Sequence, residues 1–342
     1  MTPTEEHSIS IVICTHERHV SIQKTIASLC QLNYPDFEVI VVDSSETDLT
    51  VDSLELMKNS CSFPLQIIRS KQRNISISRN IGIDRAAGEF IFFIDDDAIP
   101  PADWIDKLLA IYEERGNNCA GVGGIVRDMT TDGYPLQYCR GISNIISNTI
   151  PIRSDDVIDR NRWRSLSVSA KRRLRQRGAS RRERESQGWW YNGLMGTNSS
   201  YRKDFLEKIN GYDEFFEYFL DETDLCLRLI QAGYEIHYSD VIVDHYPQPS
   251  HNRHDQRHLT CWFSIAKNTT YFAIKHAFNK IPFPIFCLRL ILLLTYRCFL
   301  RIIRLKFTHH LSNPPIWQYI QDSIRGARLG WQAGMNLYSN KI

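Results

Sequence analysis

The sequence predicts an α/β fold, in which a mostly parallel, twisted sheet is flanked by helices and followed by a C-terminal helical extension. Short apolar runs alternate with helical segments between residues 9 and 126, an order typical of parallel sheets. After about residue 258 only long helical patterns remain. The 342 residues are 43% hydrophobic and 23% charged, values of a folded protein that exclude wholesale disorder.

Five apolar runs in the first part of the chain predict strands buried on both faces. They are residues 9–14, 37–43, 65–69, 90–94 and 119–126. Helical segments are expected after the first run to about Cys30, over residues 74–87, and from Pro100 to about Gly116. Ligands of such sheets bind beyond the carboxyl ends of the strands, so the polar residues after these runs are the first candidates for a site.

Shorter elements resume after residue 188. A strand is expected at 198–202, helices at 204–209 and 222–232, and two short strands at 234–238 and 241–245. We therefore predict an α/β domain over residues 1–250 and a helical extension over residues 251–342.

Charge is nearly balanced, with 41 Lys and Arg against 39 Asp and Glu, a net charge of +2. This balance argues against a dedicated nucleic-acid binder, and we expect no nucleic-acid partner. A basic insert over about residues 153–187 holds twelve Lys and Arg and five acids. Two interpretations of it stay open: a solvated loop, or a contact with a phosphate-rich surface such as anionic lipid or a lipid-diphosphate acceptor.

Residues 281–303 are strongly apolar but contain Arg289, Arg297 and Arg301. The uninterrupted apolar run, residues 290–296, is too short to span a bilayer. We expect a helix at the membrane interface, and a helix packed on the α/β domain is the alternative. No signal peptide is visible and the nine cysteines lack metal-ligand spacing, which favours the cytoplasm or the cytoplasmic face of a membrane.

Three consecutive acids, Asp95, Asp96 and Asp97, follow the fourth apolar run. Their carboxylates repel one another unless a cation is present. Hard oxygen ligands suit Mg²⁺ or Mn²⁺, and either cation can bridge to a diphosphate. The alternative is a solvated turn that caps the following helix.

An ordered set of motifs resembles the family-2 inverting glycosyltransferases, nucleotide-diphospho-sugar transferases of the GT-A fold. The first motifs are the segments 11–15 (IVICT), 41–45 (VVDSS), 73–82 (RNISISRNIG) and 93–100 (FIDDDAIP). The later ones are 196–198 (GTN), 211–213 (GYD), 221–228 (DETDLCLR), 233–234 (GY) and His245. The set covers about residues 8–246, and its order makes it more specific than any single motif.

The resemblance implies a nucleotide-sugar donor and assigns residues to its binding. Thr15 and Asp43 would hold the base and the ribose, while Arg73 and Arg79 would face the uracil or the diphosphate. A turn cap is the alternative for Asp43, and an exposed surface charge is the alternative for Arg79. The full set expected at the donor is Thr15, Asp43, Arg73, Arg79, Asp95, Asp96 and Asn198.

The resemblance also implies a metal site, with Asp97 as the metal ligand and Asp95 at ribose or metal. In related enzymes a histidine at the position of His245 completes the site, and imidazole would favour Mn²⁺ over Mg²⁺. A structural histidine is the alternative, and three nearby histidines compete for the role. They are His251, His254 and His258.

Inversion by direct displacement requires a base that removes the proton of the acceptor hydroxyl. The resemblance places Glu222 in this role, with Asp221 as second choice and Asp224 as third. A capping box formed by Asp221 and Asp224 is the alternative for those two acids. Trp189 and Trp190 are candidates for an acceptor wall, because aromatic rings stack on sugars, and a core cluster is the alternative.

These features together predict a metal-dependent inverting glycosyltransferase. It would move one sugar from a nucleotide diphosphate, UDP by default, to a hydroxyl of a saccharide or lipid-linked acceptor in polysaccharide or glycan biosynthesis. The Q-x-x-R-W motif of processive synthases is absent, which favours single addition. Two alternatives are a non-catalytic, membrane-associated protein that binds nucleotide sugars, and a Rossmann-type NAD-dependent oxidoreductase, against which the lack of glycine in residues 13–18 argues.

Overall fold

The computed structural model describes residues 8–132, 136–137, 193–248, 261–307 and 316–339. Contacts between residues divide the chain into two compact units. The first contains residues 1–140, 153–214 and 222–247, and the second contains residues 141–152, 215–221 and 248–342. The basic insert over about residues 153–187, with Trp189 and Trp190, lies outside the described residues, as do His251, His254 and His258.

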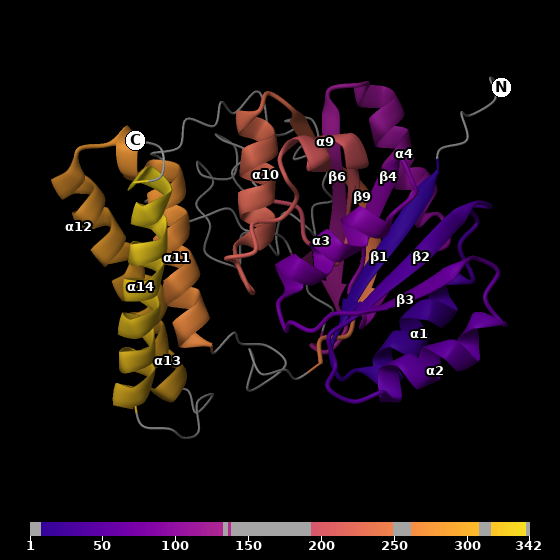
Figure 1. The fold of residues 1–342 in the computed structure, drawn as a ribbon, viewed down its shortest axis with the longest axis horizontal. Coiled ribbons are helices and arrows are strands. Elements are labelled where there is room, and N and C mark those ends of the chain that lie inside the picture. Colours follow the sequence, from indigo (N-terminus) through magenta and orange to yellow (C-terminus); the bar gives the residue numbers. More distant parts are fainter. Residues whose placement is uncertain (1–7, 133–135, 138–192, 249–260, 308–315, 340–342) are drawn as a thin grey trace. The chain divides into compact units, whose positions relative to one another are not determined.

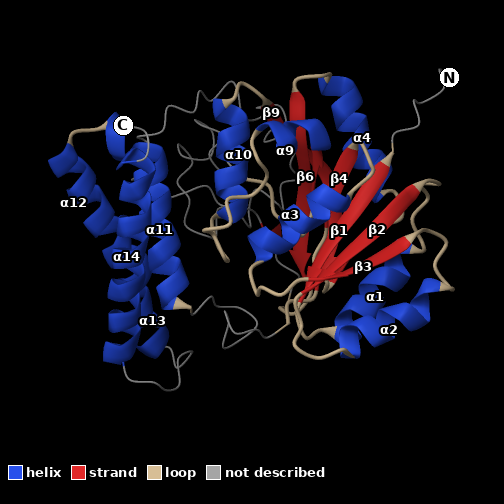
Figure 2. Cartoon of the chain, in the orientation of Figure 1, coloured by secondary structure: helices blue, strands red, loops and turns tan. Residues whose placement is uncertain are grey.

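The first unit is built on a mixed, mostly parallel sheet in the order β3-β2-β1-β4-β8-β6-β9-β5, with β7 (Leu136–Gln137) paired to β6 (Figures 1 and 2). Its parallel half comprises β1 (Ile9–Thr15), β2 (Phe37–Asp43), β3 (Leu65–Arg69) and β4 (Phe90–Phe93). These strands coincide with the first four predicted runs. Their alternating faces are both buried, as at Ile11 and Val12, which explains why the runs read as continuously apolar.

The other half of the sheet mixes directions. β8 (Ser199–Arg202) runs antiparallel between β4 and β6 (Cys119–Asp128), and β9 (Glu235–His245) runs parallel to β6. The two short strands expected at 234–238 and 241–245 are one strand, because the polar break at Ser239 and Asp240 is a register shift against β6. β5 (Ala98–Ile99) pairs antiparallel with the end of β9.

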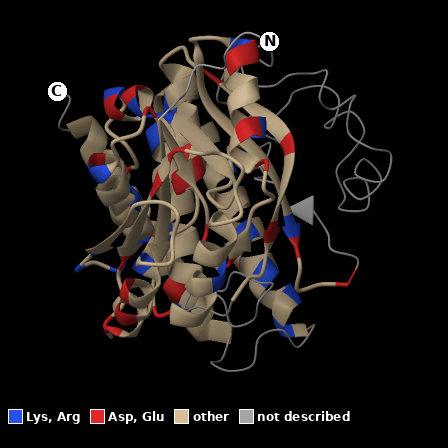
Figure 3. Cartoon of the chain, turned by 90° about the vertical axis from the view of Figure 1, so that its right-hand side faces the viewer, with Lys and Arg blue, Asp and Glu red and all other residues tan. Residues whose placement is uncertain are grey.

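The helices of the first unit are α1 (His19–Leu29), α2 (Leu49–Lys58), α3 (Ile75–Arg85), α4 (Trp104–Arg115), α9 (Lys203–Lys208) and α10 (Asp221–Gln231), whose first residue belongs to the second unit. Asn74 caps α3, since its side chain accepts from the N–H groups of Ser76 and Ile77. α3 packs on β1 and β2, while α4 packs on β6 and β9. Basic and acidic positions are interspersed over the described elements in the view of Figure 3, in keeping with the balanced charge.

The described residues from 261 onward are helical, as predicted for the C-terminal extension. It contains α11 (Trp262–Ala277), the short η2 (Phe278–Lys280), α12 (Phe283–Leu294), the π-helical turn η3 (Thr295–Leu300), α13 (Arg301–Phe307) and α14 (Ile316–Ser339). α14 lies along α11 (Figure 1), and three glycines one turn apart allow the close approach. A Cβ on Gly326 or Gly330 would come within 2.2 Å of a carbonyl oxygen of α11.

α12, η3 and α13 form one helical run from Phe283 to Phe307. Among the described residues this run is long and apolar enough to cross a membrane, with mean hydropathy 1.8 and only 22% of its most apolar window buried. Its arginines do not interrupt the helix. The run leaves large apolar side chains exposed, among them Phe283, Leu288, Ile291, Leu292, Tyr296, Leu300 and Phe307.

Candidate functional site

The carboxyl ends of three neighbouring parallel strands bring the predicted polar residues together. Thr15 ends β1 and Asp43 ends β2, and the two are paired in the strand register. Asp95, Asp96 and Asp97 follow β4, which pairs with β1 on its other side. The site edge of the sheet is therefore the one expected for parallel strands.

Asp96 is buried and turns toward β1 and the loop that follows it. It accepts hydrogen bonds from Thr15 Oγ1 (2.6 Å) and Arg18 Nη1 (2.7 Å). Burial raises the pKa of the Asp96 carboxyl above its ordinary value, against the opposing effect of the Arg18 charge. Arg18 Nη1 also donates to Asp97 Oδ2 (2.9 Å), so one guanidinium ties together two of the three acids.

Arg18 is a charged group that residue-by-residue reasoning left without a role. Burial alone would disfavour its charge, but the carboxylates of Asp96 and Asp97 outweigh burial and raise the pKa of Arg18. A permanently charged guanidinium thus offsets part of the repulsion within the acidic triplet. In the sequence, Arg18 is visible only as a basic residue three positions after Thr15. Its partners could be identified only from the fold.

Asp95, Asp97 and His245 offer ligand atoms that all lie within 4.8 Å of one another. His245 Nε2 lies 3.1 Å from Asp97 Oδ1 and 3.9 Å from Asp95 Oδ2. The register explains this proximity, because β5 follows the triplet directly and Ala98 pairs with His245 at the end of β9. Two carboxylates and one imidazole are a donor set that fits Mn²⁺, and Mg²⁺ less well.

Asp43 is fully buried, and each of its carboxylate oxygens has a partner. Oδ1 accepts from the backbone N–H of Ser45 (2.9 Å), and Oδ2 accepts from Arg69 Nη1 (2.7 Å). The turn-capping contact offered as the alternative is therefore present. Arg69, at the end of β3, is a partner that the sequence did not reveal, and the strand register places it directly opposite Asp43.

Arg79 is buried in α3, so the interpretation as an exposed surface charge is wrong. Its guanidinium carbon lies 5.9 Å from the ring centre of Phe93 and 5.1 Å from that of Tyr212. Its Nη2 atom donates to Glu222 Oε1 (2.9 Å). The structure thus brings Arg79 to the candidate base, whereas Arg73 lies exposed on the loop before α3.

The loop before β8 contacts both the candidate base and one candidate metal ligand through two consecutive residues. The backbone N–H of Gly196 donates to Glu222 Oε1 (2.8 Å), and Thr197 Oγ1 donates to Asp95 Oδ2. A Cβ on Gly196 would lie only 2.0 Å from Arg79 Nη2 and 2.5 Å from Glu222 Oε1. Only glycine therefore leaves room for this arrangement, and Thr197 is a site residue that sequence reasoning missed.

Asn198, the next residue, lies inside the sheet with no exposed surface. Its Nδ2 atom donates to the carbonyls of Ile125 (2.9 Å) and Val241 (3.3 Å), and its Oδ1 atom accepts from Trp104 Nε1 (2.9 Å). These contacts place Asn198 in a core network rather than at the surface of the site.

The three acids at the start of α10 differ in their surroundings. The Glu222 side chain is 26% exposed, whereas Asp221 and Asp224 are buried. Asp224 Oδ2 accepts from Arg228 Nε (2.7 Å), and Arg228 also donates to the carbonyls of residues 209 and 211. Asp224 therefore belongs to a hydrogen-bond network that links α10 to the preceding turn. Glu222 is the most accessible carboxylate of the three.

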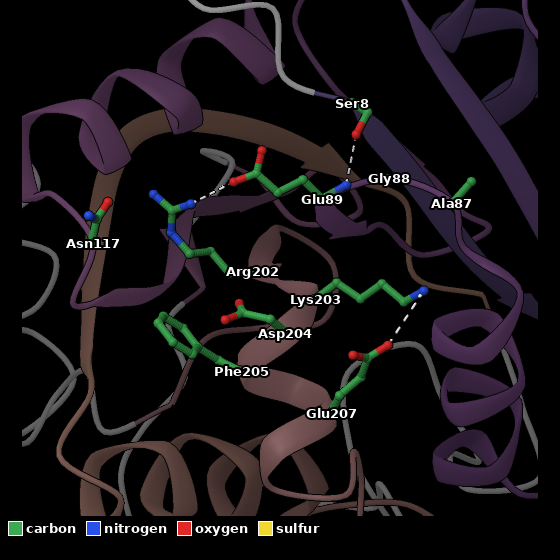
Figure 4. A pocket seen from close by; sticks show the side chains of 10 residues that line it. All are labelled: Ser8, Ala87, Gly88, Glu89, Asn117, Arg202, Lys203, Asp204, Phe205 and Glu207. Atoms are coloured by element: carbon green, nitrogen blue, oxygen red, sulfur yellow. Dashed lines mark hydrogen bonds and ion pairs between the residues drawn. The ribbon is translucent and has the colours of Figure 1, made fainter.

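A separate pocket of about 550 Å³ lies at the opposite edge of the sheet (Figure 4). Its lining includes Ser8 before β1, Glu89 before β4 and Arg202 at the paired end of β8. The charged side chains there pair with one another, as in the 2.7 Å contact of Arg202 with Glu89. The metal ligands and Glu222 are not part of this pocket.

Family models match most of the first unit. The model described as glycosyl transferase family 2 matches residues 10–209, and the model described as the N-terminal domain of galactosyltransferase matches residues 184–254. The succinoglycan biosynthesis protein ExoM of Rhizobium meliloti is 32% identical over 128 residues, 36% of this chain and 40% of that protein. A glucosyl-dolichyl phosphate glucuronosyltransferase of Haloferax volcanii is 32% identical over 123 residues, 35% of this chain and 39% of that protein. The matched segments thus span about two fifths of these relatives.

Two solved structures are similar in fold over nearly the whole chain. The mannosyltransferase PcManGT of Pyrobaculum calidifontis, in complex with GDP-Man and Mn²⁺, has a TM-score of 0.53 at 15% identity and covers 98% of this chain and 89% of that one. Residues 1–349 of Staphylococcus aureus TarS give a TM-score of 0.54 at 16% identity and cover 94% of this chain and 81% of that one. The expected GT-A-like fold, a mostly parallel sheet flanked by helices with C-terminal helices, is confirmed.

Proposed function

The chain belongs to glycosyl transferase family 2, and from this premise we propose that it transfers a single sugar, with inversion, from a nucleotide-diphosphate sugar to an acceptor hydroxyl. We further propose a UDP-sugar as donor and a saccharide or lipid-linked saccharide as acceptor, in polysaccharide or glycan biosynthesis. The observation that carries the mechanism is the Gly196–Thr197 pair, which contacts Glu222 and Asp95 through adjacent residues. A candidate base and a candidate metal ligand are thereby held in one constellation.

Asp95, Asp97 and His245 would hold Mn²⁺ or Mg²⁺, and the solved complex of the Pyrobaculum calidifontis mannosyltransferase contains Mn²⁺. A bound cation supplies positive charge for the leaving diphosphate. Arg18 holds Asp97 through Oδ2, which leaves the Oδ1 side of that carboxylate directed toward His245. The protein thus orients the carboxylate through a charge-assisted hydrogen bond.

Glu222 would remove the proton of the acceptor hydroxyl. Arg79 and the N–H of Gly196 both donate to its Oε1 atom, and we propose that these contacts orient the carboxylate toward the acceptor hydroxyl. Thr15 and Asp43, at the paired ends of β1 and β2, remain the proposed contacts of the nucleotide base and the ribose of the donor.

The test is nucleotide release from a panel of UDP-, GDP- and dTDP-sugars, with Mn²⁺ and with EDTA. We expect metal-dependent release from one donor by the wild-type protein, and its loss in Asp97→Ala. Glu222→Gln should retain donor binding and lose turnover. Failure to bind any donor, with or without metal, would overturn the proposal, whereas binding without turnover would favour the non-catalytic alternative.

We also propose that the exposed apolar face of residues 283–307 lies on the cytoplasmic face of a membrane, where a lipid-linked acceptor would be presented. Exposed apolar side chains such as Leu288 (58%) and Ile291 (61%) support this placement. In flotation with vesicles of anionic and zwitterionic lipid, the wild-type protein should rise with the vesicles, and the double variant Leu288→Glu, Ile291→Glu should not. The double variant Leu49→Glu, Leu56→Glu adds the same charge at two exposed leucines of the first unit and should float like wild type. A wild-type protein that stays in the soluble fraction contradicts the proposal.

A further inference from the structure

The chain is strained immediately before the candidate base. Phe219 and Leu220 have φ angles of 79° and 70°, two consecutive bulky residues in the left-handed region that favours glycine. Asp221 follows them as the first residue of α10, and Glu222 comes next. Strained backbone of this kind persists only where its surroundings over-determine the conformation.

Two buried polar residues of α11 supply that restraint within the second unit. Lys267 Nζ donates to the carbonyl of Phe215 (2.9 Å) and lies 3.2 Å from Glu217 Oε2. Asn268 Nδ2 donates to the carbonyls of Tyr218 (2.6 Å) and Phe219 (3.0 Å). Lys267 is 2% exposed and Asn268 has no exposed surface, so both side chains donate to this segment rather than to water.

Aromatic contacts with α11 and η3 also restrain residues 215–219. The ring of Phe215 lies 4.1 Å from that of Tyr271, centre to centre, and Phe216 meets the same tyrosine edge-on at 5.2 Å. The Arg297 guanidinium, from the π-helical turn, lies 5.3 Å from the ring centre of Phe219. Residues 215–221 therefore belong by their contacts to the second unit, although residue 222 belongs to the first.

We propose that Lys267 and Asn268 are positioning residues for catalysis. By fixing the carbonyls of residues 215, 218 and 219, they hold the strained turn that sets the direction in which the chain enters α10 and presents Glu222. The inference rests on the proposed role of Glu222 as base.

The test compares variants on one helix. Asn268→Asp keeps the shape but turns a carboxylate oxygen toward two carbonyls, Asn268→Ala removes the donor alone, and Lys267→Met removes the charge. Thr270→Val is the matched control, because Thr270 is equally buried on α11 but its hydroxyl donates to Ala266 of the same helix. The readouts are kcat, donor KM, Tm and hydrogen–deuterium exchange of the peptide covering residues 215–226.

We expect kcat to fall about 10- to 100-fold in the Lys267 and Asn268 variants, with donor KM unchanged, since a displacement of about 1 Å has this effect. Exchange in residues 215–226 should accelerate relative to Thr270→Val. A folded variant with the kcat of the control, or one in which exchange in this peptide matches the control, overturns the inference. The exchange readout needs no substrate, so it distinguishes this failure from the absence of turnover in the wild-type protein, which would overturn the proposed function itself.

Discussion

Replacing Gly196 with alanine should disable the candidate base without removing any catalytic group. The added Cβ would lie 2.0 Å from Arg79 Nη2 and 2.5 Å from Glu222 Oε1, whereas ordinary contact begins at 3.4 Å. The guanidinium would have to retreat by about 1.4 Å and the carboxylate by about 0.9 Å to restore ordinary contacts. Arg79 has little freedom to do so, because it is buried and packs against the rings of Phe93 and Tyr212.

A displacement of this size should lower kcat about 100-fold, while overpacking costs about 1–3 kcal/mol of folding free energy. Gly233→Ala is the matched control, because Gly233 has a φ of 94° and a Cβ added there would meet no atom within 4 Å. It should cost about 1–2 kcal/mol through backbone strain alone and leave kcat unchanged. Comparing the two variants therefore separates loss of stability from loss of alignment.

The assay is steady-state sugar transfer combined with a double-mutant cycle. If Gly196→Ala acts through the base, adding it to Glu222→Gln should lower kcat no further. A Gly196→Ala protein with wild-type kcat would refute the reasoning. So would full additivity with Glu222→Gln, since the two substitutions would then act on separate steps.

The remaining predictions concern the candidate metal ligands, the arginine that supports them and the third acid at the start of α10. His245→Ala should raise the Mn²⁺ concentration for half-maximal activity, and a metal titration that matches wild type would remove His245 from the site. Asp224→Asn breaks a buried ion pair and should cost about 3 kcal/mol in chemical denaturation with little selective effect on kcat, and the reverse pattern would make Asp224 the base. Arg18→Met should lower the Tm measured in EDTA, because Asp96 and Asp97 then repel without a counter-charge, and Mn²⁺ should restore more of the Tm than in wild type. Equal Tm shifts on adding Mn²⁺ would contradict that account.

The strands of the parallel half were predictable because a strand buried on both faces leaves a continuous apolar run. α2 was not, since only Thr50 and Leu54 of it are buried and its pattern carries little apolar signal. β5 has two residues, which is too short for any pattern. The helix expected from Pro100 begins at Trp104.

The acids and His245 could be named from the sequence because their residue types and order carry chemistry. Their partners could not, because those depend on how distant segments meet. Arg79 and Glu222 are 143 residues apart in the chain, and Thr197 is 102 residues from Asp95. Periodicity and spacing describe neighbours along the chain, whereas these contacts are set by strand order and register.

The reversed direction of β8 has a consequence for how this enzyme could diversify. β8 is antiparallel to both β4 and β6, so its first residue and the last residue of β6 lie at the same edge as the acidic triplet. The chain between Asp128 and Ser199 therefore departs from and returns to the catalytic edge. Insertions within that interval change the length of chain between these two strand ends without shifting the register of β6 against β8. Sequence can therefore be gained or lost there while the parallel strands that precede the acidic triplet keep their pairing.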